Sequence, residues 1–270
     1  MKQVMKFVLI AVGLVAAGAS RSQASSIVFQ AAGADAAAIT PTVNNFRTAL
    51  GNLNPNVVGS LGTGRREVNW DGVPNNFAAP NAFPGDFFNV NSPRGVVFST
   101  PGTSLEVSAN AASGNPIEFD NLNPGNSALF APFSAPRLFT AVGSFINDTN
   151  FFVPGTNGAA FSRGFGAVFT DVDAANTTSL EFFDIAGRSL GLFFVPATTG
   201  NETFSFLGVQ FTEEMIGRVR ITSGSATDAV VMDDFIYAEP NAVPEPTTCL
   251  LTAAGLGVIA RRVRAKRMQK

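Results

Sequence analysis

The 270-residue chain contains no histidine and a single cysteine, Cys249. Without histidine, the chain has no Ser-His-Asp or Cys-His catalytic group, no histidine-ligated zinc and no imidazole general base. A lone cysteine excludes an intramolecular disulfide and a cysteine metal cluster. Catalysis by this chain would therefore have to rest on carboxylate, serine, arginine or tyrosine chemistry.

Charged residues are also scarce, at 14% of the chain, and they are unevenly distributed. Every lysine lies in a terminal segment, and six of the 18 basic residues follow residue 260. Residues 25–246 hold all 20 acidic residues, so this part carries a formal charge of about −11. Such a body repels nucleic acid, and we exclude nucleic acid as a partner.

Aromatic and turn-forming residues are abundant, with 26 Phe, 26 Gly and 16 Pro. This composition favours short strands joined by turns, and a hydrophobic content of 46% is ample for a packed core. One short helix is predicted over residues 40–51, with Thr40 as its cap, Pro41 at its first position and Gly51 at its end. Its apolar face is formed by Val43, Phe46 and Leu50.

Strand-like runs fill the rest of the body. They are predicted near residues 66–70 and over residues 95–100, 104–109, 138–142, 144–153, 165–173, 179–185, 189–196, 203–211, 218–222 and 229–237. About ten strands separated mostly by turns predict an all-β fold, an antiparallel β-sandwich or jelly roll. No long linker divides residues 25–241, which we interpret as one domain.

The lone tryptophan provides one candidate binding site. Trp70 lies between Asn69 and Asp71, and an aromatic face flanked by an amide and a carboxylate fits a pyranose ring. The alternative interpretation is that Trp70 packs in the core.

Four aspartates provide a candidate cation site. Asp171 and Asp173 share one face at the end of a predicted strand, whereas the adjacent Asp233 and Asp234 point to opposite faces of the last strand. If the two strands pair, the four carboxylates suit Ca²⁺, which prefers oxygen ligands. The alternative is a set of solvated strand ends, and no recognised calcium motif is present.

Two carboxylate pairs are the only candidates for an enzyme, a glycoside hydrolase. These pairs are Glu67 with Asp71 and Glu181 with Asp184. Nothing in the sequence places either pair across a cleft, so we predict a non-catalytic protein.

The N-terminus has the pattern of a secretory signal peptide. Lys2 and Lys6 precede an apolar run over residues 7–19, and small residues permit cleavage after Ala19 or Ala24. A run of 13 residues is shorter than the roughly 20 that a spanning helix needs. Residues 1–24 therefore predict export across the inner membrane.

The C-terminus combines a proline break, an apolar segment and a basic end. Pro244, Glu245 and Pro246 precede the apolar residues 247–260, which as a helix would be about 21 Å long, short of the ~30 Å hydrocarbon core. The basic residues that follow would stay on the cytoplasmic side. Five of these six residues form what we call the basic cluster: Arg261, Arg262, Arg264, Lys266 and Arg267.

These three parts, in this order, resemble the PEP-CTERM sorting signal of Gram-negative bacteria. The resemblance covers residues 242–270 and implies recognition of Pro244, Glu245 and Pro246 by a membrane-embedded exosortase. It also implies a short C-terminal transmembrane helix before processing, and an association with exopolysaccharide and biofilm. Residues 62–101 and 164–240 resemble a body type of exported bacterial proteins, from which no activity follows.

The sequence thus predicts an exported, non-catalytic component of the cell envelope or extracellular matrix. The alternative is a carbohydrate-binding module, with or without Ca²⁺, and a carboxylate-dependent glycoside hydrolase is the remaining possibility.

Overall fold

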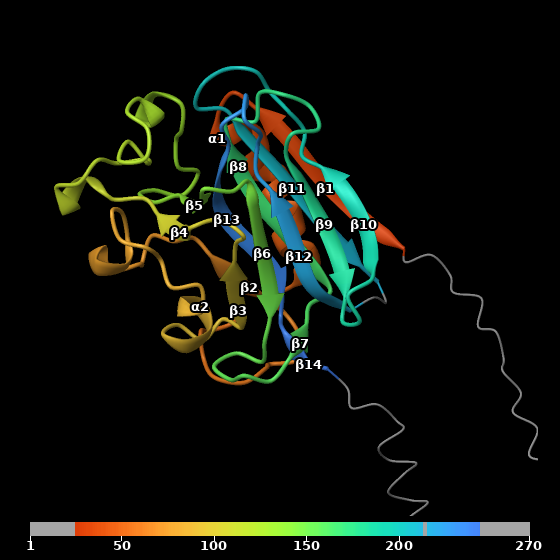
Figure 1. Cartoon of the computed structure of the whole chain (residues 1–270). Helices are drawn as coiled ribbons and strands as arrows, with labels where there is room; N and C mark the ends of the chain where they lie inside the picture. The colour runs from red at the N-terminus through yellow and green to blue at the C-terminus, as the bar shows by residue number, and fades with distance from the viewer. Residues whose placement is uncertain (1–24, 213–214, 244–270) are drawn as a thin grey trace, which may run out of the picture.

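Two antiparallel sheets pack face to face in the computed structural model, which describes residues 25–212 and 215–243 (Figure 1). The first sheet has the strand order β1-β11-β8-β13-β5-β4, and β2 also pairs with β13. Its strands are β1 (Ser26–Gly33), β2 (Arg65–Val68), β4 (Ser104–Val107), β5 (Phe139–Val142), β8 (Gly164–Thr170), β11 (Phe204–Phe211) and β13 (Val231–Ala238).

The second sheet has the order β10-β9-β12-β6-β3. Its strands are β3 (Val96–Ser99), β6 (Ile146–Phe151), β9 (Ser179–Asp184), β10 (Ser189–Phe194) and β12 (Ile216–Thr222). A small two-stranded sheet joins β7 (Ala160–Phe161) to β14 (Asn241–Ala242). The helical elements are α1 (Ala36–Leu50), α2 (Phe87–Val90) and the 3-10 turns η1 (Asn75–Phe77), η2 (Ala111–Ser113) and η3 (Asn126–Ala128).

The predicted sandwich with one short N-terminal helix is confirmed for the described residues, although the predicted elements differ from it at several points. Helix α1 begins at Ala36, four residues before the predicted cap, because the Asp35 side chain accepts the N–H of Ala38 and supplies the cap instead of Thr40. Pro41 therefore lies inside the helix, and Gly51 ends it as predicted. Strand β1, which was not predicted, pairs along its whole length with β11.

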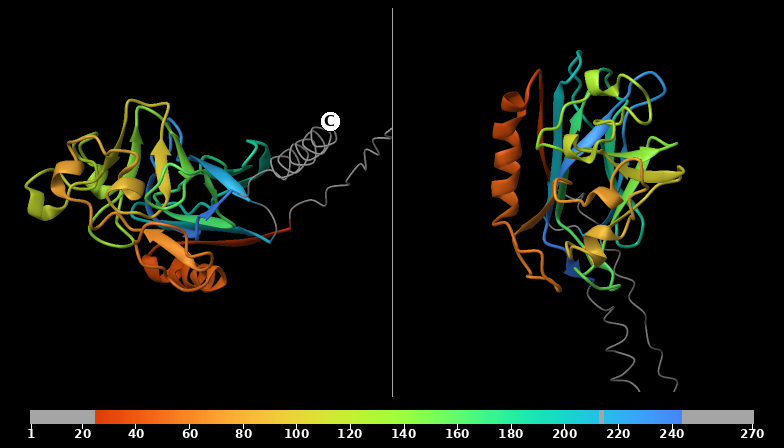
Figure 2. Two further views of the ribbon diagram at one scale, coloured as in Figure 1. Left: turned by 90° about the horizontal axis from the view of Figure 1, so that it is seen from below. Right: turned by 90° about the vertical axis from the view of Figure 1, so that its left-hand side faces the viewer.

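Helix α1 lies on the outer face of the first sheet (Figure 2). Its buried residues Val43 and Phe46 pack over β8 and β11, where two glycines face each other, Gly166 and Gly208. A Cβ atom on either glycine would lie 2.9 Å from the Phe46 ring, so glycine at both positions allows the helix to approach the sheet closely. A larger core of aromatic side chains fills the space between the two sheets.

Both ends of the described chain lie at the same end of the sandwich (Figure 1). Ser26 pairs with Phe211 at the end of β11, and β14 pairs with β7 just before β8 begins. We call this the terminal end of the sandwich. The opposite end includes Thr170, Thr222 and Val231.

A buried ion pair fixes the chain close to its last described residues. The carboxylate of Glu239 accepts from Arg66 Nε at 2.7 Å and Arg66 Nη2 at 2.8 Å, and both side chains are at most 1% exposed. Arg66 also donates to the carbonyl oxygen of Pro93 at 2.6 Å. The end of β13 is thereby joined to β2 and to the segment that precedes β3.

Several predicted features fall outside the described residues. They are the signal peptide over residues 1–24, the sorting motif Pro244–Glu245–Pro246, the apolar helix over residues 247–260 and the basic cluster. Among the helices within residues 25–212 and 215–243, none combines the length and apolar character needed to cross a bilayer.

Candidate functional site

The densest group of polar side chains surrounds a bulge in β13. Met232 pairs with Phe169 of β8 and Phe235 with Ala167, so β13 contains one residue more than β8 over this stretch. On the other edge of β13, Met232 pairs with β5 and Phe235 with β2. Asp233 and Asp234 therefore occupy the gap between β5 and β2.

Asp233 lies in the interior and accepts backbone hydrogen bonds from the segment before β5. Its Oδ2 atom accepts the N–H groups of Phe133 at 2.5 Å and Ser134 at 3.0 Å. The side chain is fully buried, and burial, followed by the charge of Asp234, raises the pKa of Asp233 well above the usual range. The backbone donors oppose this shift without overcoming it.

Asp234 joins the same group from the neighbouring position. It accepts the hydroxyl of Ser134 at 2.6 Å and Nη2 of Arg47 at 2.9 Å. Burial raises the pKa of Asp234, and the Ser134 hydrogen bond and the Arg47 charge lower it in part. The prediction that Asp233 and Asp234 point to opposite faces is wrong, since the Ser134 hydroxyl lies within hydrogen-bond distance of both carboxylates.

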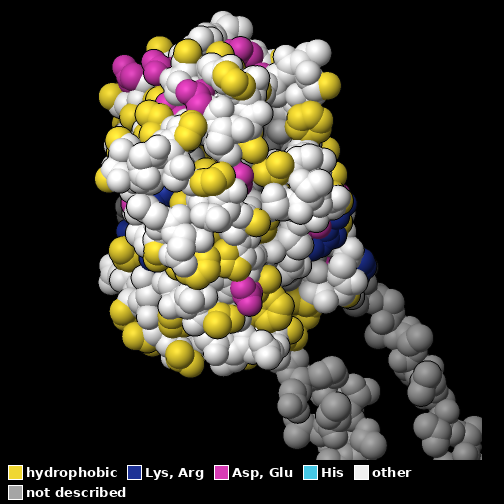
Figure 3. All heavy atoms as spheres, turned by 60° about the vertical axis from the view of Figure 1, so that its left-hand side comes forward, with side chains coloured by type: hydrophobic (Ala, Val, Ile, Leu, Met, Phe, Trp, Pro, Cys, Tyr) yellow, Lys and Arg dark blue, Asp and Glu magenta, His cyan; other side chains and the backbone are white. Residues whose placement is uncertain are grey.

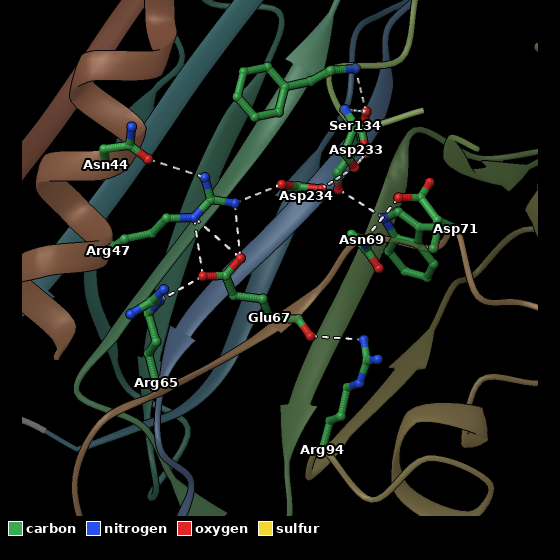
Figure 4. Close-up of polar contacts among 12 residues, drawn as sticks. Asn44, Arg47, Arg65, Glu67, Asn69, Asp71, Arg94, Ser134, Asp233 and Asp234 are labelled. Carbon is green, nitrogen blue, oxygen red and sulfur yellow. Dashed lines mark hydrogen bonds and ion pairs between the residues drawn. The ribbon is translucent and has the colours of Figure 1, made fainter. Parts of the chain in front are cut away.

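Arg47 of α1 connects this group to β2 (Figure 4). Its guanidinium donates to Glu67 Oε1 from Nε at 3.1 Å and to Oε2 from Nη2 at 2.9 Å, and Arg65 Nε donates to the same Oε1 atom at 2.6 Å. Arg94 donates to the backbone oxygen of Glu67 at 2.8 Å. We call this set the bulge network; its side chains are Arg47, Arg65, Glu67, Ser134, Asp233 and Asp234.

Trp70 does not form the predicted sugar platform. Its indole is fully buried, stacks on Phe139 with ring centroids 4.0 Å apart and donates from Nε1 to the backbone oxygen of Asp233 at 2.9 Å. The prediction of a sugar-binding Trp70 is wrong, because neither ring face is open to a ligand. Asn69 is exposed and donates to Asp71 at 2.9 Å, and burial raises the pKa of Asp71 to about 6.

The four predicted calcium ligands do not assemble. Asp233 and Asp234 belong to the bulge network, whereas Asp171 and Asp173 lie beside Asp228, which accepts the N–H of Asp173 at 3.2 Å. Within residues 25–212 and 215–243, no group of three or more acidic side chains is arranged to hold a metal ion. The predicted four-aspartate cation site is therefore wrong.

Asp171 is nonetheless an unusual carboxyl group. It is 4% exposed, its φ angle is 69°, and its Oδ1 atom has no hydrogen-bond partner among the described residues. Burial, and then the charges of Asp173 and Asp228, raise its pKa to about 7. Asp228 was not singled out in the sequence, because it lies in a loop far from Asp171 along the chain.

The two carboxylate pairs considered for glycoside hydrolysis are each engaged by neighbours. Glu67 is held by Arg47 and Arg65, as described above. Asp184 accepts from Arg188, and Glu181 accepts the hydroxyl of Ser189 at 2.9 Å. Each of these three carboxylates thus has a polar partner within the described residues.

An uncharged cavity of about 720 Å³ opens at the end of the sandwich opposite the terminal end. Its walls come from the segments around Phe119, Thr140–Ile146 and Thr222–Val231, and Phe145 at its wall is 46% exposed. A smaller cavity of about 400 Å³ lies near Val243. The larger one was not predicted, because its lining comes from three loops that are distant in sequence.

On the face of the molecule that Figure 3 shows, the acidic side chains gather mainly toward one end, and hydrophobic side chains are scattered between uncharged ones. Comparisons with protein-family models, with curated proteins and with solved structures gave no match to this chain.

Proposed function

We propose that the chain is a non-catalytic component of the cell envelope or extracellular matrix, exported through its N-terminal signal and sorted through its C-terminal Pro-Glu-Pro signal. The observation that carries the proposal for the body is the bulge network. Its acidic groups are buried and held by arginine, serine and backbone donors, an arrangement that joins α1, β2, β13 and the segment before β5.

The point at which the described body ends supports the sorting part of the proposal. The last described strand, β14, ends at Ala242, two residues before Pro244. From the sequence, prolines on both sides of Glu245 predict an extended stretch, which is the form of substrate that a processing enzyme requires. In the sequence, the motif that an exosortase would recognise thus begins directly after the last described strand.

Mass spectrometry of the mature protein from its native host tests this proposal. We expect a mass that lacks residues 261–270, and we expect the replacement of Pro244, Glu245 and Pro246 by alanine to leave the C-terminus intact. Glu202→Gln, at an exposed glutamate of the body, is the control and should be processed normally. An intact C-terminus in the unaltered protein would overturn the sorting proposal.

The large cavity favours a second candidate function, the binding of a neutral saccharide. Its volume lies within the usual range of ligand sites, and its lining combines apolar side chains with the hydroxyls of Thr140, Ser144 and Thr222. Phe145 offers an accessible aromatic face at its wall. Because the lining has no charged residue, the cavity suits an uncharged sugar better than an acidic one.

Calorimetric titration of the full chain with neutral oligosaccharides tests this second candidate. Phe145→Ala should lower the affinity at least tenfold, whereas Phe194→Ala should leave it unchanged. Phe194 is a matched control because it is 44% exposed and does not line the cavity. Absence of binding by the unaltered chain, or equal binding by both variants, would eliminate this candidate.

A further inference from the structure

The two lateral sides of the sandwich differ in whether their edge strands are covered by other parts of the described chain. On one side, the segment over residues 79–85 covers the edges of both sheets. Ala79 and Phe83 donate their N–H groups to the carbonyl oxygens of Val107 and Leu105 in β4, each at 2.7 Å. The carbonyl of Gly85 accepts the N–H of Phe98 in β3 at 2.8 Å. This side is closed to further strands.

The other side ends at β1, whose outer edge is open among the described residues. The carbonyl oxygen of Ser25 accepts the N–H of Thr212, which places the odd-numbered residues of β1 in hydrogen bonds with β11. By alternation, four residues direct their N–H and C=O groups away from the sheet: Ser26, Val28, Gln30 and Ala32. No backbone partner for these groups lies within residues 25–212 and 215–243.

This open edge lacks the features that usually protect edge strands. Proteins place lysine, proline or bulges on edges to prevent pairing with other chains. β1 has the sequence SIVFQAAG, with no charged residue and no proline, and its register with β11 is continuous over eight residues. Ile27 and Val28 are 48% and 42% exposed.

The edge of the second sheet lies on the same side (Figure 1). The rings of Phe193 in β10 and Phe211 in β11 are 6.4 Å apart, so β10 sits across from the β1 side of the first sheet. β10 is also uncharged, and its Leu192 and Phe194 are 52% and 44% exposed. Phe193 packs against the core between the sheets, so by alternation Leu192 and Phe194 lie on the outer face of the second sheet, on the same side of the sandwich as β1.

We infer that the β1 edge is a dimer interface, at which β1 of a second copy of this chain adds in antiparallel register to continue the first sheet. An antiparallel pair centred on Phe29 matches Ser26 with Ala32 and Val28 with Gln30 of the second copy. In this register all four outward residues of each copy find a partner, giving about eight backbone hydrogen bonds. A shift of this register in either direction along the strand leaves some of the outward N–H and C=O groups unpaired.

The absence of charge favours a second copy as the occupant. A two-fold axis pairs β1 with β1 of the second copy. Any charged residue on β1 would therefore lie close to the identical charge on the partner strand, and the two would repel. The body carries a formal charge of about −11, yet β1 and β10 contribute none of it. The surface that must approach its own copy is thus an uncharged part of an acidic body.

Sedimentation velocity of the full chain in a mild non-ionic detergent, over a concentration series, tests the inference. We expect a monomer–dimer equilibrium whose dissociation constant rises at least tenfold in Val28→Pro and Val28→Lys. Proline at position 28 removes only an outward N–H, so the bonds to β11 remain. Val90→Lys, at a residue that is 65% exposed and outside β1 and β10, is the control and should dimerise normally.

Cysteine cross-linking in a Cys249→Ser background tests the register. Phe29→Cys should form an intermolecular disulfide, because position 29 lies opposite position 29 of the other copy at a Cα separation of roughly 4.5 Å. Ile27→Cys should not, since Ile27 faces Ala31 of the other copy. A chain that stays monomeric, dimerisation that is unchanged in Val28→Pro, or cross-linking at position 27 in place of 29 would overturn the inference.

Discussion

Replacement of Glu239 by glutamine should destabilise the protein by about 3–5 kcal/mol. Glutamine preserves the shape of the side chain but leaves the guanidinium of Arg66 buried without a counter-charge. Glu239 also accepts from Asn54 Nδ2 at 2.8 Å and from the N–H of Leu61 at 3.0 Å, so the change weakens contacts with the loop over residues 54–61 as well. Urea unfolding followed by the fluorescence of Trp70 measures the loss.

Two further variants test whether the loss of stability in Glu239→Gln comes from the buried charge of Arg66. Arg188→Gln removes an ion pair with Asp184 in which the arginine is 57% exposed, and it should cost no more than about 1 kcal/mol. The double replacement Arg66→Met with Glu239→Leu removes both buried charges and should recover a large part of the loss. A cost below about 1 kcal/mol for Glu239→Gln would refute the reasoning, because it would mean that Arg66 needs no counter-charge.

Three further predictions concern single positions. Asp171→Asn should stabilise the protein above pH 7 by about 1–2 kcal/mol. The pKa of Asp171 is about 7 in the folded protein and near 4 in the unfolded chain. The neutral carboxyl therefore contributes its full stability below about pH 4, and this stability is lost as the pH rises through about 7. Thermal melts of both proteins from pH 4 to 8 should diverge with rising pH, and parallel curves would contradict this. Gly208→Val should cost about 1–3 kcal/mol in urea unfolding, because the added side chain meets Phe46, and an unchanged midpoint would show that α1 can move aside. The fluorescence of Trp70 should be blue-shifted and resist quenching by acrylamide until the chain unfolds, since the indole is fully buried; strong quenching of the native protein would contradict that burial.

Local sequence patterns predicted much of the architecture. Strands β6 and β8 to β13 largely follow the predicted runs, because alternating or continuous apolar residues between turn residues are a local signal. β1 was not predicted, because Gln30 and the Ala-Ala-Gly sequence at its end lower its β-strand propensity. Its conformation depends on β11, which lies far away along the chain.

The candidate site was less accessible to sequence reasoning. The pairing of Asp233 with Ser134 depends on a bulge that forms where β5 gives way to β2, and this arrangement is set by long-range pairing. Trp70 could be placed at the end of a strand, but its burial depends on Phe139 and on the backbone of Asp233. Residue types identified the candidates, and tertiary contacts decided their roles.

The common position of the two chain ends restricts how copies of the protein can associate. In the proposed two-fold pair the β1 strands run antiparallel, so the terminal ends of the two sandwiches point in opposite directions. Two chains tethered by their C-termini to one flat membrane cannot adopt this arrangement. Released chains can, and so can chains attached to two facing surfaces. In the second case the dimer would span the gap between the two surfaces and hold them together.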